Sequence, residues 1–231
     1  MRFFRTSNPI YRSAFRTEAS AQPVTYTSVA GKTVLLVVIT AITGTLGVVY
    51  IQFLPSWTIF AAVGIAFVSS LLGLFIPKAA AFFSILYAAT EGIVLGLISF
   101  MFEASYQGIV LTAVSTTVIV LLVMMILFSM NIVKIGQGFT SFLVVAMITT
   151  IVMSIVLVFT ASPPLYYLVC ILSAILATLY LFLDFSNIQR CVEQGLDHRV
   201  GWTLALGLMV SLVWLYIEIL RLLAIFAGRR R

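Results

Sequence analysis

Charged residues are scarce in this chain. Lysine, arginine, aspartate and glutamate together make up 9% of its 231 residues, whereas hydrophobic residues make up 62%. A soluble domain is about one quarter charged and about half apolar, so a single aqueous core could not bury this much apolar surface. The composition excludes an ordinary soluble domain and predicts a polytopic protein with one membrane domain.

Acidic residues are the scarcer of the charged groups, and the formal net charge is +6. The basic excess lies largely at the two ends of the sequence, at Arg2, Arg5, Arg12, Arg16, Arg229, Arg230 and Arg231. Flanking charges of this kind orient membrane proteins and contact anionic head groups. We therefore expect membrane lipids as partners and no nucleic acid.

Cysteine and histidine are nearly absent. Cys170 and Cys191 are separated by about six helical turns, so a disulfide between them would need a sharp reversal of the chain. One histidine, His198, and no cysteine pair leave no zinc site. The sequence also lacks the GxSG and GxGD motifs of intramembrane proteases. Its last apolar segment has no lysine, which a retinal protein would need there. We expect no enzyme activity and no cofactor.

Long apolar segments are what the sequence has in abundance. A spanning helix needs about 20 predominantly apolar residues, and seven segments meet this length: Thr33–Leu54, Trp57–Ile76, Ala79–Phe102, Gln107–Met130, Phe139–Thr160, Leu165–Phe185 and Trp202–Ala227. They do not alternate as barrel strands do, so the predicted fold is all-α, with seven transmembrane helices in one bundle. The predicted organisation is a tail over residues 1–32, a membrane domain over 33–227 and a basic tail over 228–231.

Basic residues occur in alternate links between these segments. The N-terminal tail, Lys78, Lys134 and the link with Arg190 and Arg199 are basic, whereas the other three links have no Lys or Arg. This pattern predicts that the N-terminus is cytoplasmic. Residues 1–30 also lack the apolar segment of a cleavable signal peptide. Seven crossings from a cytoplasmic N-terminus place the C-terminus outside, whereas the basic GRRR at the end of the sequence would favour the cytoplasm. Because the earlier basic positions outweigh this short tail, we expect the C-terminus outside.

Three carboxylates and one arginine lie within the predicted spans: Glu91, Asp184, Glu218 and Arg221. Ionisable groups in a membrane are costly and usually mark function, although a hydrogen-bonded structural acid is the alternative. Glu218 and Arg221 are spaced i, i+3, so they can pair on one helix face. Near Glu91, Gly92 and Gly96 form a small-xxx-small step that lets another helix approach closely.

Asp184 has no cationic partner on its own helix face. We expect its helix to continue to about Gln194, with Gly195 as its C-cap. If the following turn centres near Asp197, Asp184 lies opposite Val210 or Ser211 on the next antiparallel helix. Glu218 is then about 10 Å further along the same stripe.

Four stretches carry a resemblance to a known family: SNPIYRSAF in the tail, EGIVLG in the third span, LFLDFSNIQ ending the sixth and LVWLYIEILRLLAIF in the seventh. With the seven-span plan, the chain resembles the Bax inhibitor-1 family (the TMBIM proteins), and within it the bacterial branch. The resemblance implies a bundle with the last helix central and a pH-sensitive calcium leak. It also implies a location in the bacterial cytoplasmic membrane.

In that family, two aspartates on the sixth and seventh helices share a proton-dependent bond. Asp184 matches the first, but the position of the second falls at Ser211, with Glu218 two turns later. The sensor is therefore either rebuilt from Asp184 and Glu218 or reduced to one acid. By the same resemblance, Lys78 is the candidate for the basic latch of the gate.

The predicted function is a pH-sensitive leak or transporter for calcium, gated by intramembrane carboxylates. Asp184, Ser211, Glu218 and Arg221 would form the sensor and gate. Glu91 and Asp184 would line an ion path, and Asp184 with Glu218 would bind calcium transiently through oxygen ligands. The alternative is a membrane scaffold that binds other membrane proteins through residues 1–32 without conducting ions. The sequence gives no oligomeric state.

Overall fold

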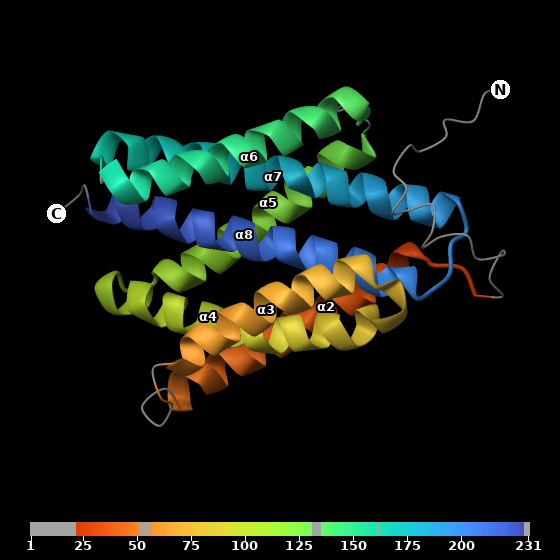
Figure 1. Cartoon of the computed structure of the whole chain (residues 1–231), viewed down its shortest axis with the longest axis horizontal. Helices are drawn as coiled ribbons and strands as arrows, with labels where there is room; N and C mark the ends of the chain where they lie inside the picture. The colour runs from red at the N-terminus through yellow and green to blue at the C-terminus, as the bar shows by residue number, and fades with distance from the viewer. Residues whose placement is uncertain (1–21, 51–54, 56, 131–134, 161, 229–231) are drawn as a thin grey trace. The chain divides into compact units, whose positions relative to one another are not determined.

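The computed structural model describes residues 22–50, 55, 57–130, 135–160 and 162–228. Their α-helices, in chain order, are α2 (Tyr26–Tyr50), α3 (Trp57–Phe75), α4 (Ala80–Ser105), α5 (Ile109–Ser129), α6 (Gln137–Thr160), α7 (Pro163–Glu193) and α8 (Val200–Gly228), with a 3-10 turn η2 (Pro77–Ala79) before α4 (Figure 1). The described residues form no strand beyond the isolated bridge between Pro23 and Asp197.

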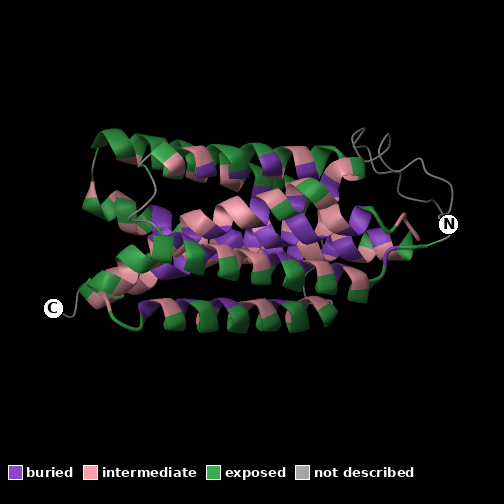
Figure 2. Ribbon diagram, turned by 90° about the horizontal axis from the view of Figure 1, so that it is seen from below, coloured by how far each residue is buried: buried purple, intermediate pink, exposed green. Residues whose placement is uncertain are grey.

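All seven α-helices are long and apolar enough to cross a membrane. This confirms the predicted all-α fold of an integral multi-pass membrane protein. Exposed positions occur in every helix beside buried ones (Figure 2), and on α6 Leu143 is the one buried residue. Apolar side chains on exposed faces suit lipid rather than water as the surrounding solvent.

Two helices extend well beyond the predicted spans. α2 begins at Tyr26 rather than Thr33. α7 ends at Glu193, beyond the predicted span to Phe185 but next to the predicted helix end at about Gln194. Several predicted features lie outside the described residues: the basic residues Arg2, Arg5, Arg12 and Arg16 of the N-terminal tail, residues 51–54 at the end of the first predicted span, Lys134, and Arg229 to Arg231.

The chain forms two compact units. Unit 1 comprises Met1–Leu97 and Asn187–Met209, and unit 2 comprises Ile98–Ser186 and Val210–Arg231. The helices α4, α7 and α8 contribute to both units. The predicted arrangement in one bundle around a central last helix remains a prediction.

Within unit 1, α2 and α4 approach closely at glycines. A Cβ atom built on Gly96 would lie 2.7 Å from the Cα of Gly44, and one on Gly44 would lie 2.9 Å from the carbonyl oxygen of Gly92. Nearby, the Thr40 hydroxyl of α2 donates to the carbonyl of Ala88 on α4 at 3.0 Å. The small-xxx-small step therefore does bring a second helix close, as the sequence predicts.

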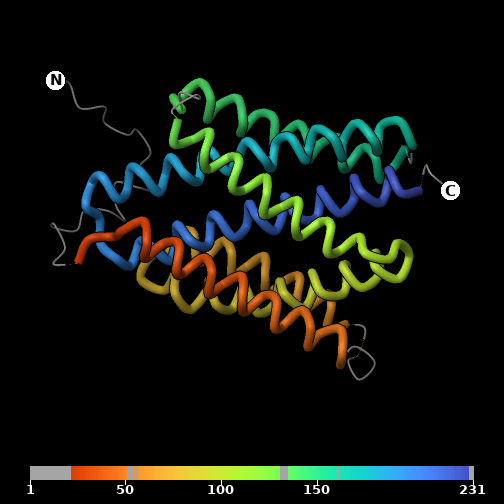
Figure 3. The backbone as a smooth tube through the Cα atoms, turned by 180° about the vertical axis from the view of Figure 1, so that it is seen from behind, coloured from red at the N-terminus to blue at the C-terminus, as the bar shows by residue number. Residues whose placement is uncertain are grey.

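The link between α7 and α8 reverses the chain within unit 1 (Figure 3). Gly195 has a φ of 61°, and its N–H donates to Val192 while that of Leu196 donates to Cys191. These two hydrogen bonds form a Schellman motif, in which the left-handed residue is usually glycine. The predicted C-cap at Gly195 is confirmed.

A short segment before α2 pairs with this link. The Val24 N–H donates to the Leu196 carbonyl at 2.8 Å, and the His198 N–H donates to the Gln22 carbonyl at 3.1 Å. The Lys32 ammonium donates to the His198 carbonyl at 2.9 Å and lies 5.5 Å from the ring centroid of Trp202. We call residues 22–24 the strap.

The link that carries Lys78 lies at the same end of unit 1. The Thr203 hydroxyl, in the first turn of α8, donates to the Gly73 carbonyl near the end of α3 at 3.4 Å. The Ser84 hydroxyl of α4 donates to the Trp202 carbonyl, also at 3.4 Å. The two basic links that the structure describes, with Lys78 and with Arg190 and Arg199, therefore share one end of unit 1, whereas the side of the membrane they face stays a prediction.

Candidate functional site

Asp184 connects α7 to α8 within unit 2. Its carboxylate accepts a hydrogen bond from the Ser211 hydroxyl. The residue is half-buried, but its Oδ2 atom is fully buried and has no hydrogen-bond partner within the described residues. The structure thus brings together the two residues that the hairpin count places opposite each other. One carboxylate oxygen is left for a proton, a cation or water.

Glu218 has a different set of partners. Its Oε1 accepts the Ser173 hydroxyl of α7 at 2.9 Å and the Arg221 Nη1 of α8 at 3.2 Å. Trp214 Nε1 donates to the same serine oxygen at 3.1 Å. Glu218 is 4% exposed, and its Oε2 has no partner within the described residues. The predicted i, i+3 pair is confirmed, and we call these four residues the Glu218 cluster.

The two carboxylates therefore belong to separate contact sets. Ser173 precedes Asp184 by about three turns of α7, which is about 16 Å along the helix axis. No hydrogen bond joins Asp184 to Glu218 in the part of the chain that the structure describes. Asp184 contacts Ser211 instead, and whether the sensor is rebuilt from two acids or reduced to one remains a prediction.

Sequence reasoning missed Ser173 and Trp214. Serine occurs in most of the apolar segments, and the tryptophan ring is largely apolar, so neither residue stands out as a partner for an acid. The signal that could have found them is the buried carboxylate itself, because an acid in an apolar interior needs donors from a neighbouring helix.

Glu91 and Lys78 both belong to unit 1. Glu91 is half-buried on α4, one turn after Tyr87, and its carboxylate forms no hydrogen bond or ion pair with the side chain of another described residue. Lys78 is exposed in η2. Their predicted roles in an ion path and a latch remain predictions.

The described residues contain no group of three or more His, Cys, Asp or Glu placed to hold a metal ion. Calcium usually takes six to eight oxygen ligands, whereas Asp184 and Ser211 offer three oxygen atoms between them. This arrangement can exchange a proton or give a passing cation a brief contact. The predicted transient calcium contact at Asp184 and Glu218 remains a prediction.

A search of curated proteins found no match to the sequence. A comparison with family models found one whose description is "Bax inhibitor 1 like", and it matches residues 8–228. The match includes all seven α-helices and both carboxylate sites. The chain belongs to the Bax inhibitor 1 like family.

Proposed function

We propose that this protein is a pH-sensitive cation leak, with calcium as the transported ion and Asp184 as the proton-sensitive gate. The observation that carries the proposal is the hydrogen bond between Asp184 and Ser211 across α7 and α8, beside a buried oxygen that has no partner among the described residues. Membership of the Bax inhibitor 1 like family supports a channel or a regulator.

The proposed mechanism depends on the two protonation states of Asp184. The ionised carboxylate accepts a hydrogen bond from the Ser211 hydroxyl and attracts a cation, but its second oxygen is buried and has no donor in the part of the chain that the structure describes. The protonated acid carries no charge and needs a different set of partners. A proton therefore changes both the attraction for a cation and the contact between α7 and α8, which is how a local charge can bias a helix arrangement.

Glu218 has a secondary role in this proposal. Arg221 neutralises it at 3.2 Å, so a passing cation is attracted less strongly there than at Asp184, which has no basic partner within the described residues. The Glu218 cluster holds α7 and α8 together, while the Asp184–Ser211 contact changes with pH. We place the protein in the bacterial cytoplasmic membrane with its N-terminus in the cytoplasm.

The test is calcium flux into proteoliposomes over about pH 5 to 8, with the parent chain, Asp184→Asn and Glu193→Gln. Asparagine imitates the neutral acid, so Asp184→Asn should show at every pH the flux that the parent shows at low pH. Glu193→Gln is the matched control, because it neutralises an exposed acid on the same helix. Its flux should retain the pH dependence of the parent.

Two results would contradict the gate. One is a pH dependence that survives in Asp184→Asn, and the other is no flux above empty liposomes from folded parent protein. The second result would favour a membrane scaffold. In that case, removal of residues 1–21, which leaves α2 intact, should abolish binding of membrane-protein partners.

A further inference from the structure

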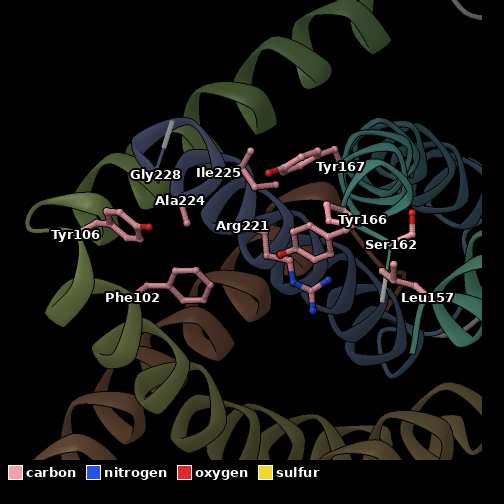
Figure 4. Close-up of a pocket in the computed structure, with 11 residues that line it drawn as sticks. Phe102, Tyr106, Leu157, Ser162, Tyr166, Tyr167, Arg221, Ala224, Ile225 and Gly228 are labelled. Atoms are coloured by element: carbon pink, nitrogen blue, oxygen red, sulfur yellow. The ribbon is translucent and has the colours of Figure 1, made fainter. Parts of the chain in front are cut away.

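A pocket of about 690 Å³ opens at one end of unit 2, and the proposed gate does not use it. Its lining comes from the end of α4 and the link after it, the last turn of α6, the link before α7, the first turns of α7 and the last turns of α8: Phe102, Tyr106, Leu157, Ser162, Pro163, Tyr166, Tyr167, Arg221, Ala224, Ile225 and Gly228 (Figure 4). Its volume lies within the range of small-molecule sites.

Arg221 supplies the positive charge of this pocket. Its side chain is 45% exposed, whereas that of Glu218 is 5% exposed. One N–H contact of 3.2 Å joins the two groups. A guanidinium has five N–H donors and no acceptor, and Arg221 makes no other hydrogen bond within the described residues. The buried carboxylate therefore holds the arginine in place from one side, while further donors remain for a ligand on the other.

Four aromatic side chains line the pocket together with the guanidinium. Figure 4 shows the Arg221 side chain beside the ring of Tyr166, with Phe102 and Tyr106 to the left and Tyr167 at the upper right. Tyrosine rings combine apolar faces with a hydroxyl, which is why they gather where a membrane protein meets head groups. The wall can thus contact both glycerol carbons and polar head-group atoms.

The first turn of α7 adds the positive end of a helix dipole at the pocket edge, but few backbone donors. Pro163 and Pro164 have no N–H, and the Tyr166 N–H already donates to the Ser162 carbonyl at 3.0 Å. Arg221 is therefore the group that would bind an anion directly.

We propose that this pocket binds the phosphate of a membrane phospholipid, with Arg221 contacting the phosphate oxygens and the aromatic wall contacting the glycerol and the start of the acyl chains. Arginine matches phosphate geometry because two of its N–H groups can reach two oxygens at once. A free phosphate would use the same arginine, but it would leave the apolar lining from Leu157, Ala224 and Ile225 in contact with water. The lining therefore favours a lipid.

The test measures ligand binding to the full-length, delipidated protein by native mass spectrometry. Three probes separate the sources of affinity: a phosphatidylglycerol, the soluble glycerol phosphate, and a diacylglycerol of the same chain length without phosphate. The phosphatidylglycerol should bind with one site per chain and at least about tenfold more tightly than either partial probe.

Two variants test the residues. The double change Glu218→Gln with Arg221→Gln removes the guanidinium without leaving a buried unpaired charge, and it should weaken phosphatidylglycerol binding about tenfold or more. Its matched control is Glu193→Gln with Arg199→Gln, which removes the same two charges at exposed positions and should bind like the parent. Ala224→Trp fills the pocket with Arg221 intact and should also abolish binding.

Three results would overturn the proposal. Equal binding by the Arg221 double variant and its control would remove the arginine from the site. Equal affinity for diacylglycerol would remove the phosphate. Glycerol phosphate that binds as tightly as the lipid would make the pocket a soluble-anion site instead.

Discussion

The ion pair between Glu218 and Arg221 gives a quantitative prediction about stability. Three variants form the experiment: Arg221→Gln, Glu218→Gln and the combination of both. Arg221→Gln leaves a carboxylate that is 4% exposed with the Ser173 hydroxyl as its remaining donor. Removal of one partner of a buried pair is strongly destabilising, whereas replacement of both by neutral groups is often close to neutral.

The magnitude follows from the contact distance. Opposite unit charges at 3.2 Å attract by about 5 kcal/mol at an effective dielectric constant near 20. Because the arginine side chain is 45% exposed, water screens the pair, and we reduce this to about 2–3 kcal/mol. Arg221→Gln should therefore lower the free energy of unfolding by about 2–4 kcal/mol. Glu218→Gln should lower it by about 1–2 kcal/mol, because an amide oxygen still accepts from both donors.

The double variant isolates the interaction between the two residues. It should be less destabilised than the sum of the single variants by about 2 kcal/mol, which is the coupling expected of residues in one network. The free energy of unfolding would be measured in mixed micelles by titration with a denaturing detergent, followed by circular dichroism. Strict additivity of the two single changes would refute the reasoning, because it would mean that the pair contributes no net coupling.

Two further predictions concern unit 1. Gly96→Ala should lower the free energy of unfolding by about 1–3 kcal/mol, because the new Cβ would lie 2.7 Å from the Cα of Gly44 on α2. Its control is Gly64→Ala, where nothing lies within 4 Å of the new Cβ, and which should change that free energy by less than about 1 kcal/mol. Equal effects of the two variants in the same detergent titration would contradict this prediction. Lys32→Met should speed amide hydrogen exchange at the strap about fivefold, since it removes about 1 kcal/mol of hydrogen bonding and cation–π contact. Its control is Lys78→Met, which removes the same charge at an exposed position and should leave the exchange rate unchanged. A strap that exchanges equally slowly in both variants would show that Lys32 does not stabilise it.

The existence of the seven helices could be predicted because each rests on local composition. An apolar segment of spanning length has few other stable structures in a membrane. Gly195 could also be predicted as a C-cap, since the left-handed conformation favours glycine whatever the rest of the fold does.

The start of α2 could not be predicted in the same way. Residues 26–32 include Thr27, Ser28 and Lys32, which give no apolar signal. Their helical conformation is supported by a contact between Lys32 and the His198 carbonyl, 166 residues away in sequence. A local pattern contains no information about a partner at that distance.

The partner of Asp184 could be predicted by counting residues from the turn, whereas the partner of Glu218 could not. Asp184 lies close to the reversal, so counting residues back from the turn places Ser211 opposite it, and the structure forms that contact. Glu218 lies two turns further from the reversal. The same count would place Ala177 opposite Glu218, whereas the structure places Ser173 there, one helical turn away. Two antiparallel helices are not perfectly aligned, and the misalignment of their axes grows with distance from the turn. Counting residues from the turn therefore becomes less accurate along the pair.

This change of register has a functional consequence. For Asp184 and Glu218 to share one proton, α7 would have to slide along α8 by about 10–16 Å, which are the distances along the helix axis from Ser211 to Glu218 and from Ser173 to Asp184. Such a movement would break the Glu218 contacts to Ser173 and leave two buried acids without their donors. Rearrangement at Asp184 alone breaks one hydrogen bond, to Ser211. The proposed gate therefore needs only a change at the Asp184 contact, with the Glu218 cluster as the fixed point between the two helices.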